Sequence, residues 1–405
     1  MARDTSGQGV GEIIGQDESV QIGAAQTGAL SILTTSQPAE IEAAWRTLEA
    51  NGIESPGQSF DFLTQWITSF NIPQSDQLFV LVSEGETPVA ALALHRTRLW
   101  GMKVLAPFPG EHVGTNAPLL NLDYIARMSL PARAAMWQQV KKALSGAELV
   151  YWAGLPEIMG GIDGVFADLG QSVVSDHLHR AVFDTWEQCD SIQRTRSRRK
   201  HDKQQGAKLT AMGEVTFEIV DECAELPAVL DCMFQQRNDR FRELGIADPF
   251  DDATIRGFYA AAFSGGKTLK GRLHVLRLNG EIVATRYNLV HGNRMFCLIS
   301  GMSTAPKIQP GSPGKQCLLR VMQTEFDKGL TMFDMGAGMT DEKRHWCNEH
   351  IVLRHHYLAL TWNGRLIAAT HSAWQRTKSF LKSNSRIFAA LKSLRARLSG
   401  TKRRD

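Results

Sequence analysis

The 405-residue chain has only six cysteines, and no two of them are spaced as a C-x-x-C pair. Scattered cysteines of this kind favour buried thiols in a reducing compartment over a disulfide framework or a zinc site. The chain also lacks long hydrophobic runs: none reaches the roughly 18 residues that a membrane-spanning helix needs. Its first residues contain no basic region followed by an apolar one, so we expect no signal peptide. These absences predict a cytoplasmic protein without a resident metal.

Several catalytic motifs are absent as well. No G-x-S-x-G, H-E-x-x-H or Walker-type phosphate loop occurs, which argues against a serine hydrolase, a zinc protease or a nucleoside triphosphatase. The net charge of +3 is too small to indicate a nucleic-acid-binding protein by itself. What remains is an ordinary globular composition, with 43% hydrophobic and 21% charged residues, and a length sufficient for two domains.

The clearest structural pattern begins at Arg272. Asn279-Gly280 and His291-Gly292-Asn293 separate three strands rich in apolar side chains, as in antiparallel hairpins. A loop from Pro306 to Gly314 follows, and then apolar residues recur at helical intervals before a further strand. The N-terminus of such a helix offers free backbone N–H groups and the positive end of the helix dipole. This order therefore suits a pyrophosphate-binding loop.

The first half of the chain contains a similar pattern. Pro88-Val89-Ala90 precedes Ile282-Val283-Ala284 by 194 residues, which indicates one fold used twice rather than a solenoid. The first copy lacks a Ser-Pro-Gly loop before an apolar helix, so we expect the second copy to be catalytic. Between the copies lies a cationic segment, Arg194–Lys203. Two interpretations of it stay open: it binds RNA, a phosphorylated acceptor or an anionic lipid, or it is a helix face exposed to solvent. No aromatic residue interleaves it, and we predict no nucleic-acid partner.

The strands, loop and helix after Arg272, together with the cationic segment, resemble the acyl-CoA-binding core of the GNAT acetyltransferase superfamily. More narrowly, they resemble its two-lobed bacterial CelD-type branch, associated with cellulose and exopolysaccharide biosynthesis, which is similar to the FemAB/FemX aminoacyltransferases. Glu342 stands where that family usually has a tyrosine, and Met339 where an acidic residue is common. The resemblance is carried by Arg194–Lys203, Asn279–Ala284, Ser312-Pro313-Gly314 with Leu318 and Leu319, and Phe333–Gly338 with Lys343 and Trp346.

The resemblance implies an α+β fold of two tandem GNAT-like lobes, each a mixed, mostly antiparallel sheet flanked by helices. A basic connecting helix is expected between the lobes, placed to cross the cleft. Around Asn363-Gly364 the sequence favours one more hairpin. The expected divisions are a disordered N-terminal arm (1–30), an N-terminal lobe (31–185), the connecting helix (186–210), a C-terminal acyl-CoA-binding lobe (211–370) and a basic amphipathic C-terminal helix (371–405).

By the same resemblance the protein is an N- or O-acyltransferase that uses acetyl-CoA or a longer acyl-CoA as co-substrate. The acceptor amine or hydroxyl attacks the thioester directly, so alignment supplies most of the rate. A sugar or other small-molecule acceptor in polysaccharide or cell-envelope metabolism is implied. The residues expected to bind acyl-CoA are Gly311, Ser312, Pro313, Gly314 and Lys315; those expected to bind the acceptor are Arg240, Trp346 and Arg198; and those expected in catalysis are Asp334, Lys343, Glu342 and His345.

For several of these residues a second interpretation stays open. Asp334 either removes a proton from the acceptor or caps the turn that follows its strand. Lys343 either orients the acceptor and meets developing negative charge, or belongs to a solvated run of mixed charge. Glu342 or His345 would supply a base in place of the absent tyrosine.

Two other functions stay open. One is FemX-like aminoacyl transfer from aminoacyl-tRNA to a peptidoglycan precursor, which predicts steeply salt-dependent RNA binding. The other is a non-catalytic accessory role at a membrane polysaccharide synthase, with docking through residues 373–405. That segment combines cations with an apolar stripe, a pattern that suits the inner face of a membrane or a helix docked on its own protein. The stripe consists of Phe380, Ile387, Phe388, Leu391, Leu394 and Leu398.

Overall fold

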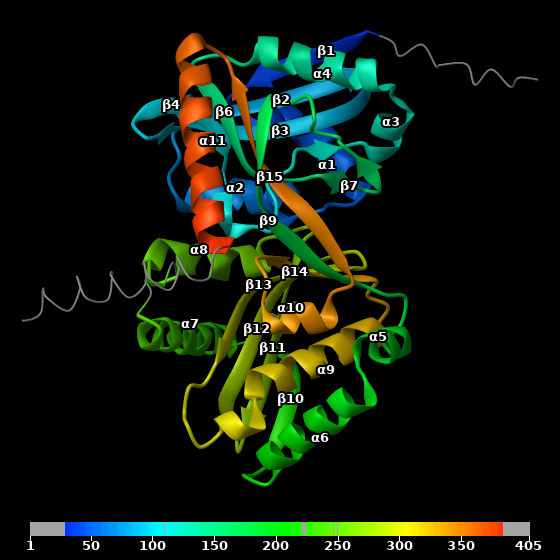
Figure 1. Ribbon diagram of the computed structural model, residues 1–405, viewed down its shortest axis with the longest axis vertical. Helices are drawn as coiled ribbons and strands as arrows, with labels where there is room; N and C mark the ends of the chain where they lie inside the picture. Colours follow the sequence, from blue (N-terminus) through cyan, green and yellow to red (C-terminus); the bar gives the residue numbers. More distant parts are fainter. Residues whose placement is uncertain (1–28, 109, 221–223, 246, 249, 384–405) are drawn as a thin grey trace, which may run out of the picture.

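The computed structural model describes residues 29–383, except for residues 109, 221–223, 246 and 249. A 13-stranded sheet runs through both halves of the molecule (Figure 1), in the order β1-β2-β3-β4-β6-β15-β9-β14-β13-β12-β11-β10, with β5 paired to β3. A separate small sheet joins β7 (Ile158–Met159) to β8 (Ile162–Asp163). The strands of the large sheet are β1 (Leu30–Thr35), β2 (Gln77–Glu84), β3 (Thr87–Leu99), β4 (Met102–Pro107), β5 (Leu119–Leu120), β6 (Leu149–Pro156), β9 (Gln171–Val182), β10 (Val215–Val220), β11 (Lys270–Leu278), β12 (Glu281–His291), β13 (Arg294–Met302), β14 (Met332–Ala337) and β15 (Glu349–Ala359).

Helices flank this sheet in both halves. No helix among the described residues is long and apolar enough to cross a bilayer. The α-helices are α1 (Glu42–Ala50), α2 (Phe60–Ser69), α3 (Leu122–Arg127), α4 (Leu130–Ala143), α5 (Trp186–Gln193), α6 (Arg196–Thr210), α7 (Leu226–Glu243), α8 (Ala253–Ser264), α9 (Pro313–Asp327), α10 (Asp341–Trp346) and α11 (Trp362–Ser383). Short 3-10 helices are η1 (Pro38–Ile41), η2 (Pro56–Gln58), η3 (Gln74–Asp76), η4 (Gly110–His112) and η5 (Gln309–Gly311).

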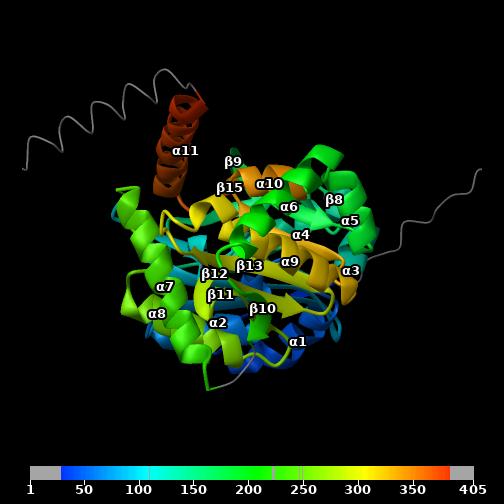
Figure 2. The ribbon, with the colours of Figure 1, turned by 90° about the horizontal axis from the view of Figure 1, so that it is seen from below.

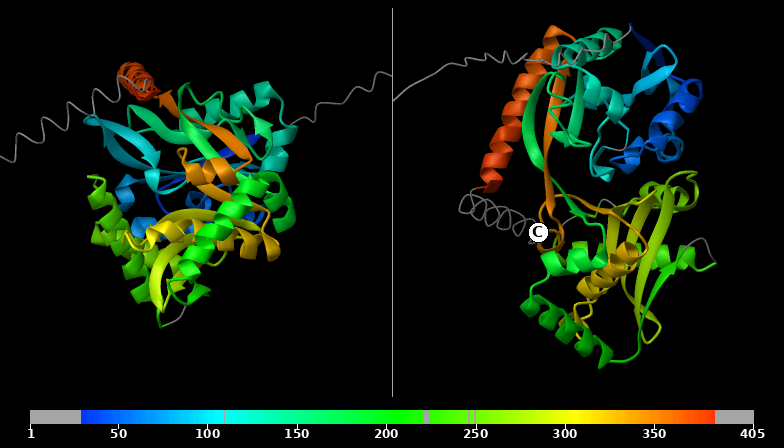
Figure 3. Two further views of the ribbon diagram at one scale, coloured as in Figure 1. Left: turned by 60° about the horizontal axis from the view of Figure 1, so that its bottom comes forward. Right: turned by 90° about the vertical axis from the view of Figure 1, so that its right-hand side faces the viewer.

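The two halves of the sheet follow one pattern. Strands β1 to β4 and β6 correspond in order to β10 to β14, and each set contains one parallel pair, β4 with β6 and β13 with β14. The next strand of each half crosses over: β9 pairs with β14, and β15 pairs with β6. β9 and β15 also pair with each other along most of their length, between the two lobes (Figure 3). Each half therefore completes its sheet with a strand from the other, and the predicted α+β fold of two similar lobes is confirmed.

One hydrophobic core joins the halves. Helix α2 of the first half packs on α8 of the second, where Phe62 and Trp66 meet Phe258 edge to face at ring-centroid distances of 5.0 and 4.9 Å. The same cluster of buried residues extends from Trp45 on α1 to Phe296 on β13. Because such aromatic pairs stabilise beyond the area that they bury, the lobes are packed together and not merely linked by strands.

The segment after β15 differs from the sequence prediction. Asn363-Gly364 forms no hairpin, because α11 begins at Trp362 and continues to Ser383. The Thr361 hydroxyl accepts the Gly364 N–H at 3.1 Å, as a helix N-cap does. Gly364 also lies directly against the Glu148 carbonyl, where a Cβ would come within 1.9 Å of the oxygen. Contact with β6 and its neighbours therefore overrides the local turn propensity of Asn-Gly.

The basic connecting helix also lies elsewhere than expected. α6 packs on α9 and η5 at the far end of the second lobe, and β9 and β15 cross between the lobes instead (Figure 1). Two of its arginines pair with carboxylates, Arg198 with Asp202 and Arg199 with Asp190, and Arg194, which precedes the helix, also pairs with Asp190. Residues 1–28 of the predicted arm, and the predicted stripe beyond residue 383, lie outside the described part of the chain.

Candidate functional site

A slot opens in the second lobe where two parallel strands part. β13 and β14 pair only from Arg294 to Phe296, opposite Met332 to Asp334, and β13 then continues to Met302 along β12. The pocket beyond the paired region has a volume of about 390 Å³. It is lined by Arg240, Arg286, Ser300, Gly301, Met302, Gln309, Ser312, Gly314, Lys315, Thr340, Asp341 and Glu342.

The N-terminus of α9 forms one wall of this slot. Pro313 starts the helix, and the first amide to donate within it is that of Gln316, to the Ser312 carbonyl at 3.0 Å. The amides of Gly314 and Lys315 come before that bond, at the positive end of the helix dipole. A Cβ on Gly314 would stand 2.9 Å from the Met302 sulfur, so glycine keeps the slot open.

The loop residues predicted to bind acyl-CoA divide into two groups. Ser312, Gly314 and Lys315 line the slot. Ser312 has the left-handed conformation (φ 47°, ψ 62°), and its hydroxyl accepts a 2.8 Å hydrogen bond from Gln205 of α6. Gly311 and Pro313 are buried, and Gly311 packs against Leu209 of α6. These two residues therefore shape the loop but do not line the slot.

Arg286 of β12 is a slot residue that the sequence analysis missed. Its side chain is 5% exposed, its Nη2 donates to Glu342 Oε2 at 2.8 Å and to the Gly314 carbonyl at 3.5 Å, and its Nε has no partner. Burial acts to lower the pKa of Arg286, but the Glu342 carboxylate, together with Cys297 and Cys317, raises it above its ordinary value. The slot thus contains a fixed cation with an unused N–H donor. The only sequence signal was an arginine in the middle of a strand that has no other charged residue between its two ends.

Of the residues predicted for catalysis, only Glu342 lines the slot. Lys343 donates instead to the carbonyls of Gly336, Ala337 and Gly338, at 3.2, 2.6 and 2.8 Å. Burial lowers its pKa. His345 turns back to the Asp341 carbonyl of its own helix. The lysine thus fastens the turn after β14, and α10 presents the Glu342 carboxylate to the slot.

Asp334 lies at a buried ion-pair chain between the lobes. Its Oδ2 accepts from Arg180 Nε at 2.9 Å, and its Oδ1 accepts the Gly336 N–H at 2.7 Å. Arg180 also pairs with Glu54, which in turn pairs with Arg294, both at 2.5 Å. Burial raises the pKa of Asp334 against the opposing effect of Arg180. This geometry favours a structural role for Asp334 over proton removal.

The three residues predicted to bind the acceptor are not brought together. Arg240 of α7 is exposed and lines the slot. Trp346 is buried in the core of the second lobe, 6.0 Å between ring centroids from Trp186, and so contacts no solute there. Arg198 lies on α6 in an ion pair with Asp202 and does not line the slot.

A second pocket of about 320 Å³ lies between the lobes. It contains two buried polar atoms without a hydrogen-bond partner, Asn116 Oδ1 and His355 Nδ1. Burial lowers the pKa of His355 to about 4, so its imidazole is neutral at pH 7. Asp176 and Lys378 add one charge of each sign. The lining of this pocket thus combines neutral polar residues with one charge of each sign.

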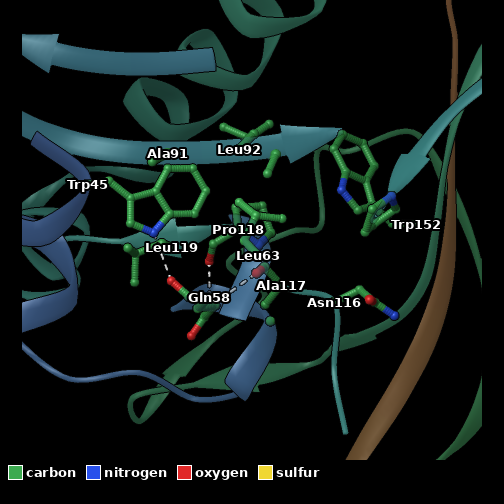
Figure 4. Close-up of a pocket in the computed structure, with 13 residues that line it drawn as sticks. Trp45, Gln58, Leu63, Ala91, Leu92, Asn116, Ala117, Pro118, Leu119 and Trp152 are labelled. Atoms are coloured by element: carbon green, nitrogen blue, oxygen red, sulfur yellow. Dashed lines mark hydrogen bonds between the residues drawn. The ribbon is translucent and has the colours of Figure 1, made fainter. Parts of the chain in front are cut away.

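The equivalent region of the first lobe is closed. Its pocket, beside β3, β4 and β6, has a volume of only about 20 Å³. Figure 4 shows the Gln58 side chain among the residues that line it, with hydrogen bonds to the carbonyls of Ala117 and Pro118 at 3.1 and 2.8 Å. Leu92 occupies the β3 position that corresponds to Arg286 when Pro88 is matched with Ile282. Of these two equivalent regions, only that of the second lobe therefore has an open pocket and a buried arginine beside it.

The fold and the slot together define a class of protein. It has paired lobes, and a pocket opens between two parallel strands that part at the N-terminus of the helix that joins them, here α9. Residues 196–344 match the family model described as an acetyltransferase (GNAT) domain. The matched part of the chain contains the slot, α9 and α10.

Comparison with solved structures finds the same fold across both lobes. FemX aligns with a TM-score of 0.55 and 11% identity, over 84% of this chain and 99% of that one. The C-terminal domain of a putative lysylphosphatidylglycerol synthetase from Agrobacterium fabrum aligns with a TM-score of 0.51 and 12% identity, over 83% and 96%. At these identities the likeness concerns the fold alone. No curated protein sequence matches the chain.

Proposed function

We propose that the protein transfers an acyl group from acyl-CoA directly to an amine or hydroxyl of a polar acceptor. The observation that carries the proposal is the slot of about 390 Å³ at the N-terminus of α9, with Arg286 buried beside it. The amides of Gly314 and Lys315 would receive the CoA pyrophosphate, since helix N-termini favour anions. The Lys315 ammonium would add a charge-assisted hydrogen bond.

Glu342 is the base in this proposal, and Arg286 positions it. The acceptor nitrogen or oxygen attacks the thioester carbon, the C–S bond breaks, and the thiolate leaves with its electron pair. Glu342 takes the proton that the acceptor loses. The ion pair with Arg286 holds the carboxylate toward the slot, and the preformed charges need no rearrangement during the reaction.

The pocket between the lobes supports a polar, sugar-like acceptor. Its lining residues Asn116, Ser175 and His355 carry side chains that can hydrogen-bond hydroxyl or amine groups. Asp176 would favour an amino group, and Lys378 an oxygen-rich one. An amino sugar or polysaccharide precursor fits these demands, in keeping with the resemblance to the CelD-type branch.

Titration of the full chain with acetyl-CoA and longer acyl-CoAs, followed by calorimetry, tests the donor. Replacing one slot cation by an anion, Lys315→Glu, should weaken acyl-CoA binding by about tenfold or more, because a charge-assisted hydrogen bond becomes a repulsion. Lys142→Glu is the matched control: it makes the same charge change on the exposed face of α4. Equal loss in both variants, or no acyl-CoA binding by the unmodified chain, would refute the proposed donor.

The rival donor is aminoacyl-tRNA, since the fold is shared with FemX and with a putative lysylphosphatidylglycerol synthetase. The same titration with aminoacyl-tRNA in place of acyl-CoA distinguishes the two. Binding of tRNA with a steep salt dependence, and none of acyl-CoA, would favour aminoacyl transfer. Binding of neither would favour the non-catalytic accessory role.

A further inference from the structure

Helix α11 has one face packed on the first lobe and one face turned outward. The Tyr357 hydroxyl of β15 forms a 2.8 Å hydrogen bond with His371 Nδ1, and the Gln171 side chain of β9 donates a hydrogen bond of 3.1 Å to the Ser372 hydroxyl. Ile367 and Ala368 complete the packed face, in a small core with β4, β6, β9 and β15. These contacts fix which side of α11 faces away from the protein, at the periphery of the molecule (Figures 2 and 3).

The outward face carries large apolar side chains. Trp362, Leu366 and Trp374 are between 53% and 76% exposed. With 3.6 residues per turn they fall within about 120° of one another around the helix. Arg365 and Arg376 border this stripe on one side and Lys378 on the other, as the same geometry requires. The result is a discontinuous apolar band on α11, interrupted by Asn363, Thr370 and Thr377 and flanked by cations.

A neighbouring turn extends the band. Trp100, between β3 and β4, is 57% exposed and meets the His371 ring edge to face at 4.8 Å. Its φ of 51° lies in the left-handed region, which a bulky side chain occupies only at a cost in strain. Exposed Arg98 and Lys103 flank it in the sequence. An aromatic residue is thus held outward, beside α11, at a position that favours asparagine or glycine.

The C-terminal region of the chain, up to Arg404, carries only positively charged side chains. Residues 350–404 contain 12 of the chain's 45 lysines and arginines and none of its 42 acidic residues. The remainder of the chain therefore has 33 basic and 42 acidic residues. The segment after Ser383 alone contributes seven of these cations: Arg386, Lys392, Arg395, Arg397, Lys402, Arg403 and Arg404.

We propose that the outward face of α11, with Trp100, docks the protein on an anionic membrane surface. Tryptophan favours the boundary between lipid headgroups and hydrocarbon. Helices that lie in that boundary combine such residues with a cationic border. The absence of acidic residues from 350–404 makes the region complementary to anionic lipid, whereas a second copy would bring the same positive charge.

Docking by this face would also place a pocket near the lipid. Gln375, Lys378 and Ser379 of α11 line the pocket between the lobes. A ligand with its polar group at the membrane surface would therefore reach that pocket beside α11. The docking proposal itself stands without acyl transfer, because it depends on the exposed face and its charge alone.

Co-sedimentation of the full chain with vesicles tests the proposal. The protein should sediment with phosphatidylcholine vesicles containing 30% phosphatidylglycerol, and far less with phosphatidylcholine alone or at high salt. The triple variant Trp362→Ser, Leu366→Ser, Trp374→Ser should lower the partition coefficient about tenfold or more. Circular dichroism and the melting temperature should be unchanged, since none of the three side chains is in the core.

A matched control removes exposed apolar side chains elsewhere. Leu130, Ile192 and Leu244 are 60% to 68% exposed and lie on α4, on α5 and at the end of α7, so their replacement by serine should leave vesicle binding intact. Three outcomes would overturn the proposal: no binding of the unmodified chain, equal loss in both triple variants, or a dimer in solution that only the α11 variant dissociates. The last would assign the face to a second copy.

Discussion

At the scale of single residues, the protein uses buried charge in two ways. Arg286 and Glu342 form a pair that opens onto the slot, where one carboxylate remains 28% exposed. Asp334, Arg180 and Glu54 form a buried chain between the lobes, with every side chain at most 6% exposed. The Glu342 carboxylate lines the slot and can take a proton from a ligand there, whereas a buried chain of ion pairs contributes mainly to structure. Mutation of the first pair should therefore impair turnover, and mutation of the second set should lower the free energy of unfolding.

Replacing Glu342 by glutamine should impair turnover but not donor binding. The amide keeps a hydrogen bond to Arg286 but cannot take a proton, so kcat should fall by about 10²- to 10⁴-fold. Thiol release from acyl-CoA in the presence of a panel of amino sugars measures turnover, and calorimetry measures acyl-CoA affinity. Unchanged kcat would remove Glu342 from the mechanism; lost affinity with normal kcat at saturation would make it a binding residue.

Replacing Arg180 by methionine should lower stability strongly. The change leaves Asp334 and Glu54 buried without their shared cation, which costs about 3–5 kcal/mol of the free energy of unfolding. Arg344→Met is the comparison, because its pair with Asp341 is 65% and 74% exposed and exposed pairs contribute about 0–1 kcal/mol. Urea denaturation of both variants measures the difference. Similar midpoints would show that the buried chain is not a major stabilising feature.

At the scale of elements, β15 and α11 belong to the first lobe in space although they follow the second in sequence. β15 supplies the partner of both β6 and β9, and α11 packs on the same strands. Without β15, two interior strands would become edges with unpaired backbone groups. The limits of 31–185 and 211–370 for the lobes remain a prediction, but each of these ranges contains a strand that pairs in the other half.

Truncation should expose this dependence. A chain that ends at Cys347 lacks β15 and α11, and should be insoluble or lack a cooperative unfolding transition. A chain that ends at Ser383 keeps every described element after Cys347 and should fold with a melting temperature near that of the full chain. Soluble yield and thermal circular dichroism distinguish the two. A stable, cooperative fragment 1–347 would contradict the structural role assigned to β15.

At the scale of the whole molecule, one sheet and one shared core connect the lobes. The reciprocal exchange of β9 and β15 means that neither lobe keeps its sheet if the other unfolds. The packing of α2 on α8 adds a hydrophobic connection. Cooperative unfolding of both lobes is therefore expected, in contrast to two-domain proteins joined only by a linker.

Differential scanning calorimetry should show this as a single transition. The calorimetric enthalpy should equal the van't Hoff enthalpy, as in a two-state unit. Acyl-CoA, if it binds the second lobe, should raise the one transition as a whole. Two resolved transitions, of which ligand shifts only the second, would show that the lobes unfold independently.

Much of the fold was predictable because it depends on neighbours in sequence. Asn279-Gly280 forms the predicted turn, with φ of 53° and 82°, since Asn-Gly tolerates positive φ at both positions. The apolar spacing after Pro313 predicted α9, which ends at Asp327 two residues before Gly329. The similarity of Pro88-Val89-Ala90 to Ile282-Val283-Ala284 revealed the two related lobes. All three signals lie within a few residues of the elements that they predict.

The sequence by itself determined the hairpin at Asn279-Gly280, helix α9, the repeat and the loop at the start of α9. Only the tertiary structure decided that Arg286 and Glu342 meet at the slot, that Trp346 is buried, that Asn363-Gly364 enters a helix, and that β9 and β15 change places. Each of these depends on a contact between residues far apart in the chain. A local pattern specifies the backbone of its own segment, whereas burial, ion pairing and strand exchange are set by whichever segment packs against it.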